Sequence, residues 1–371
     1  ACLGQMGEDG KGEMWVCTQG QWYIRRMCSA VLGTDASQLR VTPSEIGGGF
    51  GGKTTIFMEP LALALSRKAG GRPVKLVMSR AEVLRATGPT ASASMDVKLG
   101  MKADGTLTAA SVNFRMQGGA FLGSSPVGEA LSCALACYNI PAVHHEGYEV
   151  LANRPKAAAY RAPGSPMAAF AVESLLDEMC RELGLDPLAV RLKNAVHEGV
   201  KSSYGPTYNR IGLVETLQAA MAHANLKVPL GPNQGRGVAS GFWFNHGGET
   251  SVSLAIGEDG TVTVSVGTPD IGGSRASLGM MTAETLGIAY EAVRVNIVET
   301  GALGVNEPTH GSRATFASGL AAVEAAKQAI KQMCARAAAE WGIEPEAVEW
   351  LGGAAVPAGP NAGKFPPMTI A

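Results

Sequence analysis

The stretch that most constrains this chain is Ile46-Gly47-Gly48-Gly49-Phe50-Gly51-Gly52-Lys53-Thr54-Thr55, in which five of the first seven residues are glycine. It follows a strand-like run at 39–41 and precedes a helix-like run at 59–68. Glycines at such a junction let the backbone take positive φ angles, and the N–H groups that follow can bind an anion. The stretch therefore fits three interpretations: a P-loop from Gly47 to Thr54, a cofactor loop of another kind, or a tight turn without a ligand.

On both sides of this stretch, the periodicity of apolar residues and the positions of turn residues predict strands that alternate with helices. Residues 197–233, rich in Gly, Ser, Pro and Tyr, look like a crossing between domains. We therefore predict a first domain at 1–200, a crossing segment at 201–233 and a second domain at 234–371. Strands are predicted at 14–18, 39–41, 73–78, 91–101, 107–116, 251–256, 262–266 and 293–298, and helices at 19–32, 59–68, 130–138, 166–183, 187–196, 274–286 and 318–341.

The two predicted domains share an internal repeat. Leu32-Gly33 is followed by Leu39-Arg40-Val41, and Leu286-Gly287 is followed at the same spacing by Val293-Arg294-Val295, 254 residues later. A strand, a glycine turn and a helix precede each copy, and a loop of small residues follows it. We expect the two loops, 47–55 and 311–316, to face one ligand.

Bulk composition excludes several classes of protein. The 371 residues, 46% of them hydrophobic, can form large cores, and the net charge of −1 gives no sign of nucleic acid or an anionic membrane as partner. The seven cysteines contain no CxxC pair, which indicates free thiols in a reducing compartment, so we predict a cytoplasmic protein. Because the chain begins at Ala1 and stops in mid-pattern, we expect it to be an internal piece of a longer polypeptide.

A P-loop enzyme needs a carboxylate, usually at the end of a nearby apolar strand, to help hold Mg²⁺. The apolar strand after the glycine stretch instead ends in Ser79-Arg80. A P-loop also gives no reason for a second copy of the unit. A nucleotide-binding P-loop protein therefore remains only as an alternative.

Four ordered motifs make the chain similar to the molybdopterin-binding large subunit of the molybdenum hydroxylases, the family of xanthine dehydrogenase and aldehyde oxidase. This resemblance runs from residue 1 to the end. It implies an α+β fold of two related mixed-sheet domains, packed by helices, with the cofactor cleft between them. The motifs are GGGFGGK at 47–53, Tyr160-Arg161-Ala162-Pro163-Gly164, the turn at 267–273 and the loop at 311–316.

The resemblance also assigns cofactor contacts. Phe50, Arg161 and Gly311 would lie near molybdenum through its ligands, although a buried structural arginine paired with a carboxylate is the alternative for Arg161. The family often has Gln where this chain has Gly273, so only backbone donors are expected there. The residues implied to bind molybdopterin are Phe50, Gly51, Arg161, Ile271, Gly272, Gly273, Gly311, Ser312, Arg313 and Thr315.

Three positions implied to line the substrate pocket differ from purine-oxidising relatives. Thr54 replaces a glutamate, Glu129 an arginine and Pro163 a stacking phenylalanine, which disfavours xanthine. Ala162 stands where carbon monoxide dehydrogenases carry cysteine, which disfavours carbon monoxide and copper. Glu129 has two open interpretations, a pocket acid that repels anions and an N-terminal helix cap.

The resemblance implies hydroxylation of an aldehyde or an N-heteroaromatic carbon, with water as the oxygen source. The cofactor would be molybdopterin, in its cytosine dinucleotide form, with molybdenum. FAD and 2Fe-2S clusters are expected on other segments or subunits, together with the rest of the molybdenum subunit, a small-molecule substrate and a possible homodimer of the assembly. No catalytic residue is predicted in this chain, because the family's glutamate base is not among its residues, so the fragment alone should be inactive. A non-catalytic scaffold of the same fold is a further alternative.

Overall fold

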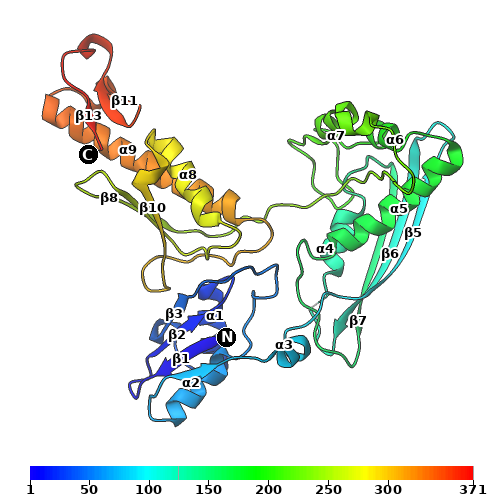
Figure 1. Cartoon of the computed structure of the whole chain (residues 1–371), viewed down its shortest axis with the longest axis horizontal. Coiled ribbons are helices and arrows are strands. Elements are labelled where there is room, and N and C mark those ends of the chain that lie inside the picture. Colours follow the sequence, from blue (N-terminus) through cyan, green and yellow to red (C-terminus); the bar gives the residue numbers. More distant parts are fainter. Residues whose placement is uncertain (124, 371) are drawn as a thin grey trace. The chain divides into compact units, whose positions relative to one another are not determined.

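The computed structural model describes residues 1–123 and 125–370, and its contacts divide the chain into two compact units (Figure 1). One unit joins Ala1–Ser79 with Phe244–Ala371, and the other is the continuous segment Arg80–Trp243. Contacts in space and repeats in sequence are different criteria, so the domain limits at 1–200, 201–233 and 234–371 stay a prediction. Both units combine sheets with helices, which confirms the α+β prediction.

The discontinuous unit contains two mixed sheets, ordered β3-β2-β1-β4 and β10-β9-β8, and a short antiparallel sheet, β11-β12-β13. Met14, Val16, Ile24 and Leu63 are fully buried in the first core, between the first sheet and the helices α1 and α2. The elements of this unit are β1 (Cys2–Met6), β2 (Gly12–Val16), α1 (Gln21–Leu32), β3 (Leu39–Pro43), α2 (Glu59–Lys68), β4 (Val74–Leu76), β8 (Val252–Ile256), β9 (Val262–Val266), α8 (Ser274–Leu286), β10 (Val293–Ile297), α9 (Gly319–Trp341), β11 (Val348–Leu351), β12 (Ala354–Pro357) and β13 (Met368–Thr369).

Strand register confirms the internal repeat. β1 pairs antiparallel with β2 as β8 does with β9, and β3 and β10 each return through a helix to pair parallel with the second strand of their copy. Gly33 and Gly287 end the two helices with positive φ, where glycine is favoured. A third helix, α9, ends in the same way at Gly342 before a 3-10 turn and β11. The matching Cα partners are Cys2 with Val16 and Val252 with Val266 in the hairpins, and Gly12 with Leu39 and Val262 with Val293 in the parallel pairs.

The continuous unit is built on the sheet β5-β6-β7, with α4 and α5 packed along it (Figure 1). β5 and β6 pair antiparallel across the turn at Asp104-Gly105, and β7 pairs parallel with β6 after α4. Phe114, Met116 and Leu176 are fully buried between the sheet and the helices. The elements are α3 (Arg80–Ala86), β5 (Ala93–Met101), β6 (Leu107–Gly119), α4 (Val127–Ala134), β7 (Ala142–Leu151), α5 (Ser165–Leu183), α6 (Pro187–Lys193) and α7 (Leu213–Ala222).

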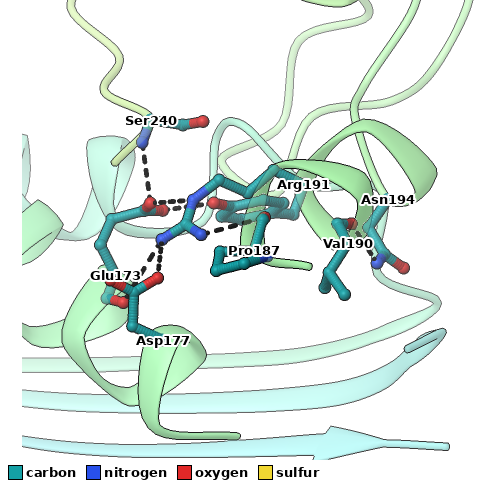
Figure 2. A network of polar contacts seen from close by, with 8 residues as sticks. Glu173, Asp177, Pro187, Val190, Arg191, Asn194 and Ser240 are labelled. Carbon is teal, nitrogen blue, oxygen red and sulfur yellow. Dashed lines mark hydrogen bonds and ion pairs between the residues drawn. The ribbon is translucent and has the colours of Figure 1, made fainter. Parts of the chain in front are cut away.

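A buried ionic network ties α5 to α6 and to the segment that leaves this unit (Figure 2). Arg191, with no solvent exposure, donates from Nε to Glu173 (2.7 Å) and pairs with Asp177 (2.8 Å). Glu173 also accepts from the Ser240 amide (2.7 Å) and from the Tyr138 hydroxyl. Burial alone would lower the pKa of Arg191, but Glu173, Tyr138 and Asp177 together outweigh it and raise that pKa above its ordinary value. The charge of this arginine is therefore fixed and fully partnered.

Several predicted helix boundaries were wrong, in two cases because a residue at the helix end bonds a distant part of the chain. The helix predicted at 19–32 begins at Gln21, because Gln19 bonds other loops instead. The helix predicted at 130–138 begins at Val127 and ends at Ala134. The helix predicted to reach 196 ends at Lys193, because Asn194 turns back to bond the backbone at Gly105 and Leu107. β1, β7, α3, α7 and the sheet β11-β12-β13 were not predicted.

Candidate cofactor site

Backbone strain marks the predicted cofactor loops. Among the described residues, the non-glycine residues with positive φ are Phe50, Arg161, Ala162, Asn233 and Ser312. All except Asn233 lie in loops that the sequence motifs had singled out. Such angles are costly for residues with a Cβ atom and concentrate where a ligand or a reaction requires them. The strained backbone therefore marks these loops as candidates for a ligand-binding site.

The loop at 47–55 presents a free amide at Phe50. The Phe50 N–H donates to no acceptor in the described part of the chain, and the residue is 57% exposed. The Gly51 amide, which the sequence also assigned to the cofactor, instead donates to the Gln19 side chain (3.0 Å). The Thr54 hydroxyl donates to Gly51 O (2.9 Å), so it stabilises the loop.

The geometry of this loop disfavours a P-loop. The ammonium of Lys53 donates to Ile46 O (2.7 Å) and to the Cys17 sulfur (3.2 Å), so it points back into its own loop. In a P-loop this lysine reaches the phosphates, and a helix begins beside it. Here the next helix, α2, begins only at Glu59.

The sequence did not predict a role for Gln19, whose side chain joins the 47–55 loop to Thr309, just before the 311–316 loop. Its side-chain oxygen accepts from the amides of Gly51 and Lys53 (3.0 Å each), and its nitrogen donates to Thr309 O (2.6 Å). The Thr309 amide returns a hydrogen bond to Gln19 O (2.7 Å). A Cβ atom on Gly49 would lie 2.5 Å from the Gln19 carboxamide carbon, which explains the third glycine of the motif. The side chain of Gln19, a residue that is 3% exposed, therefore links the 47–55 loop to the segment that leads into the 311–316 loop.

The second loop offers donors at Gly311, Ser312 and Thr315. The amides of Gly311 and Ser312 donate to nothing within the described residues, and the hydroxyls of Ser312 and Thr315 are likewise unengaged and lie on exposed residues. Successive free N–H groups in a positive-φ turn form an anion-binding concavity. The loop then leads through a π-helical turn, Ala314–Ser318, into α9.

Arg313 has a different role from the one expected of a ligand residue. Its guanidinium is fully buried and donates to the backbone oxygens of Gly247, Gly248, Glu249 and Glu307 and to the Thr250 hydroxyl. Burial lowers the pKa of this group, partly opposed by Glu307. With its side-chain donors occupied and its own amide bonded to His310 O, Arg313 holds the loop in place.

Gly311 gives a sharp test of the close packing in this loop. A Cβ atom there would lie 2.0 Å from His246 Cδ2, at a φ of +55°. Gly272 has a similar φ, +66°, with open space around it. We expect Gly311→Ala to lower the free energy of unfolding by about 1–3 kcal/mol more than Gly272→Ala does, because overpacking adds to the shared backbone cost. Urea unfolding measures both.

Adding His246→Ala to Gly311→Ala should recover part of that difference by removing the clashing ring. Equal losses for Gly311→Ala and Gly272→Ala would contradict the packing argument.

The turn at 271–273 precedes α8 and exposes further amides. Gly272 and Gly273 both have positive φ, and their N–H groups donate to no acceptor in the described ranges. Ile271 N–H donates to Ser274 Oγ (3.3 Å). Asp270 caps the helix by accepting from the Arg275 amide (3.0 Å), and the Arg275 side chain neutralises it (3.6 Å). A polar cavity of about 300 Å³ lies beside the turn, lined in part by Asp270 and Arg275.

The remaining predicted residues lie together in the continuous unit. A Cβ atom on Gly164 would touch Pro126 O (2.6 Å) and Ala130 Cβ (2.8 Å), so the loop carrying Arg161 and Pro163 packs on the start of α4, where Glu129 lies in the first turn. Arg161 is exposed and has no ion pair with any described residue, so the alternative of a buried structural arginine was wrong. The Glu129 side chain has no hydrogen bond to any described residue and lies in the first turn of α4.

Comparison with known proteins identifies the family of the chain. Models of the molybdopterin cofactor-binding domain match residues 1–195 and 214–368. The chain therefore belongs to the molybdopterin cofactor-binding family, and it is similar to molybdenum-binding subunits of xanthine dehydrogenases and to aldehyde oxidoreductases.

Individual relatives extend this finding. The xanthine dehydrogenase molybdenum-binding subunit of Escherichia coli O157:H7 is 32% identical over 79% of this chain and 41% of its own length. The nicotine 6-hydroxylase large subunit of Paenarthrobacter nicotinovorans is 27% identical over 88% of this chain and 44% of its own length. Quinoline 2-oxidoreductase from Pseudomonas putida 86 has the same fold, with a TM-score of 0.85 and 23% identity over 100% of this chain and 50% of that one. The chain thus spans less than half the length of these two sequence relatives.

Within the described residues, no helix combines the length and the apolar surface that a membrane span requires. No group of three or more His, Cys, Asp and Glu side chains in those residues is placed to hold a metal ion.

Proposed function

We propose that this chain is the molybdopterin-binding part of an enzyme that hydroxylates an aldehyde or an N-heteroaromatic carbon with water as the oxygen source. The observation that carries the proposal is the set of amides at Phe50, Gly272, Gly273, Gly311 and Ser312 that donate to no described residue, on strained or glycine turns of one unit. Their donor chemistry fits a pterin with a phosphate tail. When bound, the cofactor would supply the redox-active metal and the oxygen transfer.

Each residue then has a definite task. The amides of Gly272, Gly273, Gly311 and Ser312, with the hydroxyls of Ser312 and Thr315, would bind phosphate and pterin oxygens. The Phe50 amide would donate to an oxygen ligand of the metal. Gln19 and Arg313 would position the loops, and Ile271 would shape the third turn. Arg161 would place its guanidinium beside the ligands of the metal.

The assembly around this chain is part of the same proposal. We propose the cytosine dinucleotide form of molybdopterin, with FAD and 2Fe-2S clusters on other segments or subunits and a possible homodimer. The names of two relatives, a molybdenum-binding subunit and a large subunit, support a multi-subunit enzyme. Seven free thiols support a reducing, cytoplasmic location. Molybdenum near one per chain in the purified enzyme is expected, and none at all would favour a scaffold without cofactor.

Arg161→Ala tests the proposed place of the metal. Arg161 is exposed and unpaired among the described residues, so the free energy of unfolding should change by less than about 0.5 kcal/mol. We expect turnover and molybdenum content to fall together, by roughly tenfold or more, because a charged contact to the ligands is lost. Arg161→Lys should rescue only part of this, since lysine lacks the planar fork. Full turnover at full molybdenum occupancy in Arg161→Ala would rule the role out.

Glu129→Gln tests substrate choice in the holoenzyme. An acid in a dry pocket repels anionic substrates, and Glu129 is half-buried without a capping bond. We expect the substitution to raise kcat/KM for carboxylated aldehydes or heterocycles by roughly threefold to tenfold and to leave neutral analogues unchanged. Equal effects on carboxylated and neutral substrates would show that Glu129 only stabilises the N-terminus of the helix.

A further inference from the structure

Cys17 and Lys53 form a sulfur–amine pair at the base of the 47–55 loop. Lys53 Nζ lies 3.2 Å from Cys17 Sγ and is fixed there by its second hydrogen bond, to Ile46 O (2.7 Å). Both side chains are half-buried. The nitrogen is therefore already in contact with the sulfur that an oxidant would modify.

Cys17 also differs from most other cysteines of the chain. Five of the seven thiols are buried, and only Cys17 and Cys334 are partly open to solvent. Burial raises the pKa of Cys28 and of Cys137 to about 12, so these thiols stay protonated and unreactive. Oxidation by a small oxidant should therefore concentrate on the two accessible sulfurs, and Cys17 has an amine fixed beside it.

We propose that Cys17 and Lys53 form a reversible sulfur–nitrogen cross-link when the protein meets a peroxide. In the first step the Cys17 sulfur attacks one peroxide oxygen, the O–O bond breaks, and the products are a sulfenic acid and one water. In the second step the Lys53 amine, having released one proton, attacks that sulfur. An S–N bond forms, the S–O bond breaks, and the hydroxyl leaves as a second water. Sulfur is oxidised by two electrons and the peroxide is reduced to water.

The bond would lock the glycine loop to the turn that carries Gln19. Lys53 O already accepts from the Gln19 amide (2.9 Å) and from the Thr18 hydroxyl (3.3 Å), so both chain segments lie together before any cross-link forms. The cross-link replaces a hydrogen bond by a covalent bond and removes the positive charge of Lys53. It also protects Cys17 from irreversible oxidation, because a sulfenamide returns to thiol and amine with a thiol reductant.

Peptide mapping of the purified protein tests the proposal. After one equivalent of hydrogen peroxide, we expect a species lighter than the reduced chain by two hydrogen atoms. Tandem mass spectrometry should place the loss in a linked peptide pair containing Cys17 and Lys53, and dithiothreitol should restore both peptides. Lys53→Arg keeps a cation beside the sulfur without a nucleophilic amine. It should instead gain one oxygen at Cys17, trapped by a 1,3-diketone.

Two further variants complete the test. Cys17→Ser should abolish the linked pair, and Cys334→Ser, which removes the other accessible thiol, should leave it unchanged. Sulfenic or sulfinic acid at Cys17 of the unsubstituted protein without a linked pair, or no oxidation there, would overturn the proposal. If Lys53→Arg does not fold, the map of the unsubstituted protein decides alone.

Discussion

Gln19→Ala should uncouple the two glycine loops and release the cofactor. The substitution leaves the amides of Gly51 and Lys53 and the carbonyl of Thr309 without partners in a site that is almost closed to water. Each unsatisfied group costs about 1–3 kcal/mol unless the loop opens to solvent, so opening is the favourable response. We expect at least a roughly tenfold loss of bound molybdenum and much faster hydrogen exchange at the Gly51 and Lys53 amides.

Gln19→Glu is the matched control, because a carboxylate keeps the acceptor for both amides and loses only the donor to Thr309. We expect the amides of Gly51 and Lys53 to stay protected, while protection is lost around Thr309. Hydrogen exchange reports this in the absence of cofactor as well. Unchanged exchange at all three positions in Gln19→Ala would show that the loops are held by other contacts.

Arg191→Met should give the largest loss of stability in the chain. It leaves the buried Glu173 carboxylate with only the Ser240 amide and the Tyr138 hydroxyl as partners. Breaking a buried pair on one side costs about 3–5 kcal/mol, because the remaining charge is uncompensated. Urea unfolding, followed by hydrogen exchange in α5 and α6, should show the loss in Arg80–Trp243 first.

A double variant separates charge from packing. Glu173→Leu combined with Arg191→Met removes both charges, so it should lose clearly less stability than the two single variants added together. Asp177 is 41% exposed and can be solvated after the change. Additive losses would mean that the network stabilises the unit by shape alone.

The elements whose bounds were predicted correctly are those with clear start and stop residues in the local sequence. The helices predicted at 59–68 and 274–286 have the observed bounds of α2 and α8, because a proline or glycine marks their starts and a glycine follows close to their ends. β7 was missed because its sequence, with two histidines and a glycine, has no clear alternation. Its pairing with β6 depends on the tertiary structure, which the local sequence pattern does not reveal.

The candidate site shows the same division between local and distant information. The glycine-rich stretch and the motifs shared with the molybdenum hydroxylases were enough to locate the loops with strained backbones at 50, 161–162 and 312. Gln19 could not be found in this way, because its partner Thr309 is 290 residues away. Arg313 was assigned to the cofactor because it falls in the loop motif shared with the molybdenum hydroxylases, whereas its guanidinium donates to backbone carbonyls that no motif reveals. The loops could thus be found from their local sequence motifs. The side chains that hold the loops in place could not, because their bonding partners are brought together only by the fold.

The split of one unit across Ala1–Ser79 and Phe244–Ala371 has a consequence for biosynthesis. A ribosome releases the first glycine loop long before the segment carrying Thr309 has been translated, and all of Arg80–Trp243 emerges between them. Joining the ends of an unfolded tether of that length costs roughly 4–5 kcal/mol of chain entropy, and prior folding of Arg80–Trp243 shortens the tether. Arg191, whose ion pairs stabilise that intervening segment, would thereby govern how quickly nascent chains reach a state able to accept a cofactor, and its loss would first be seen as aggregation during expression.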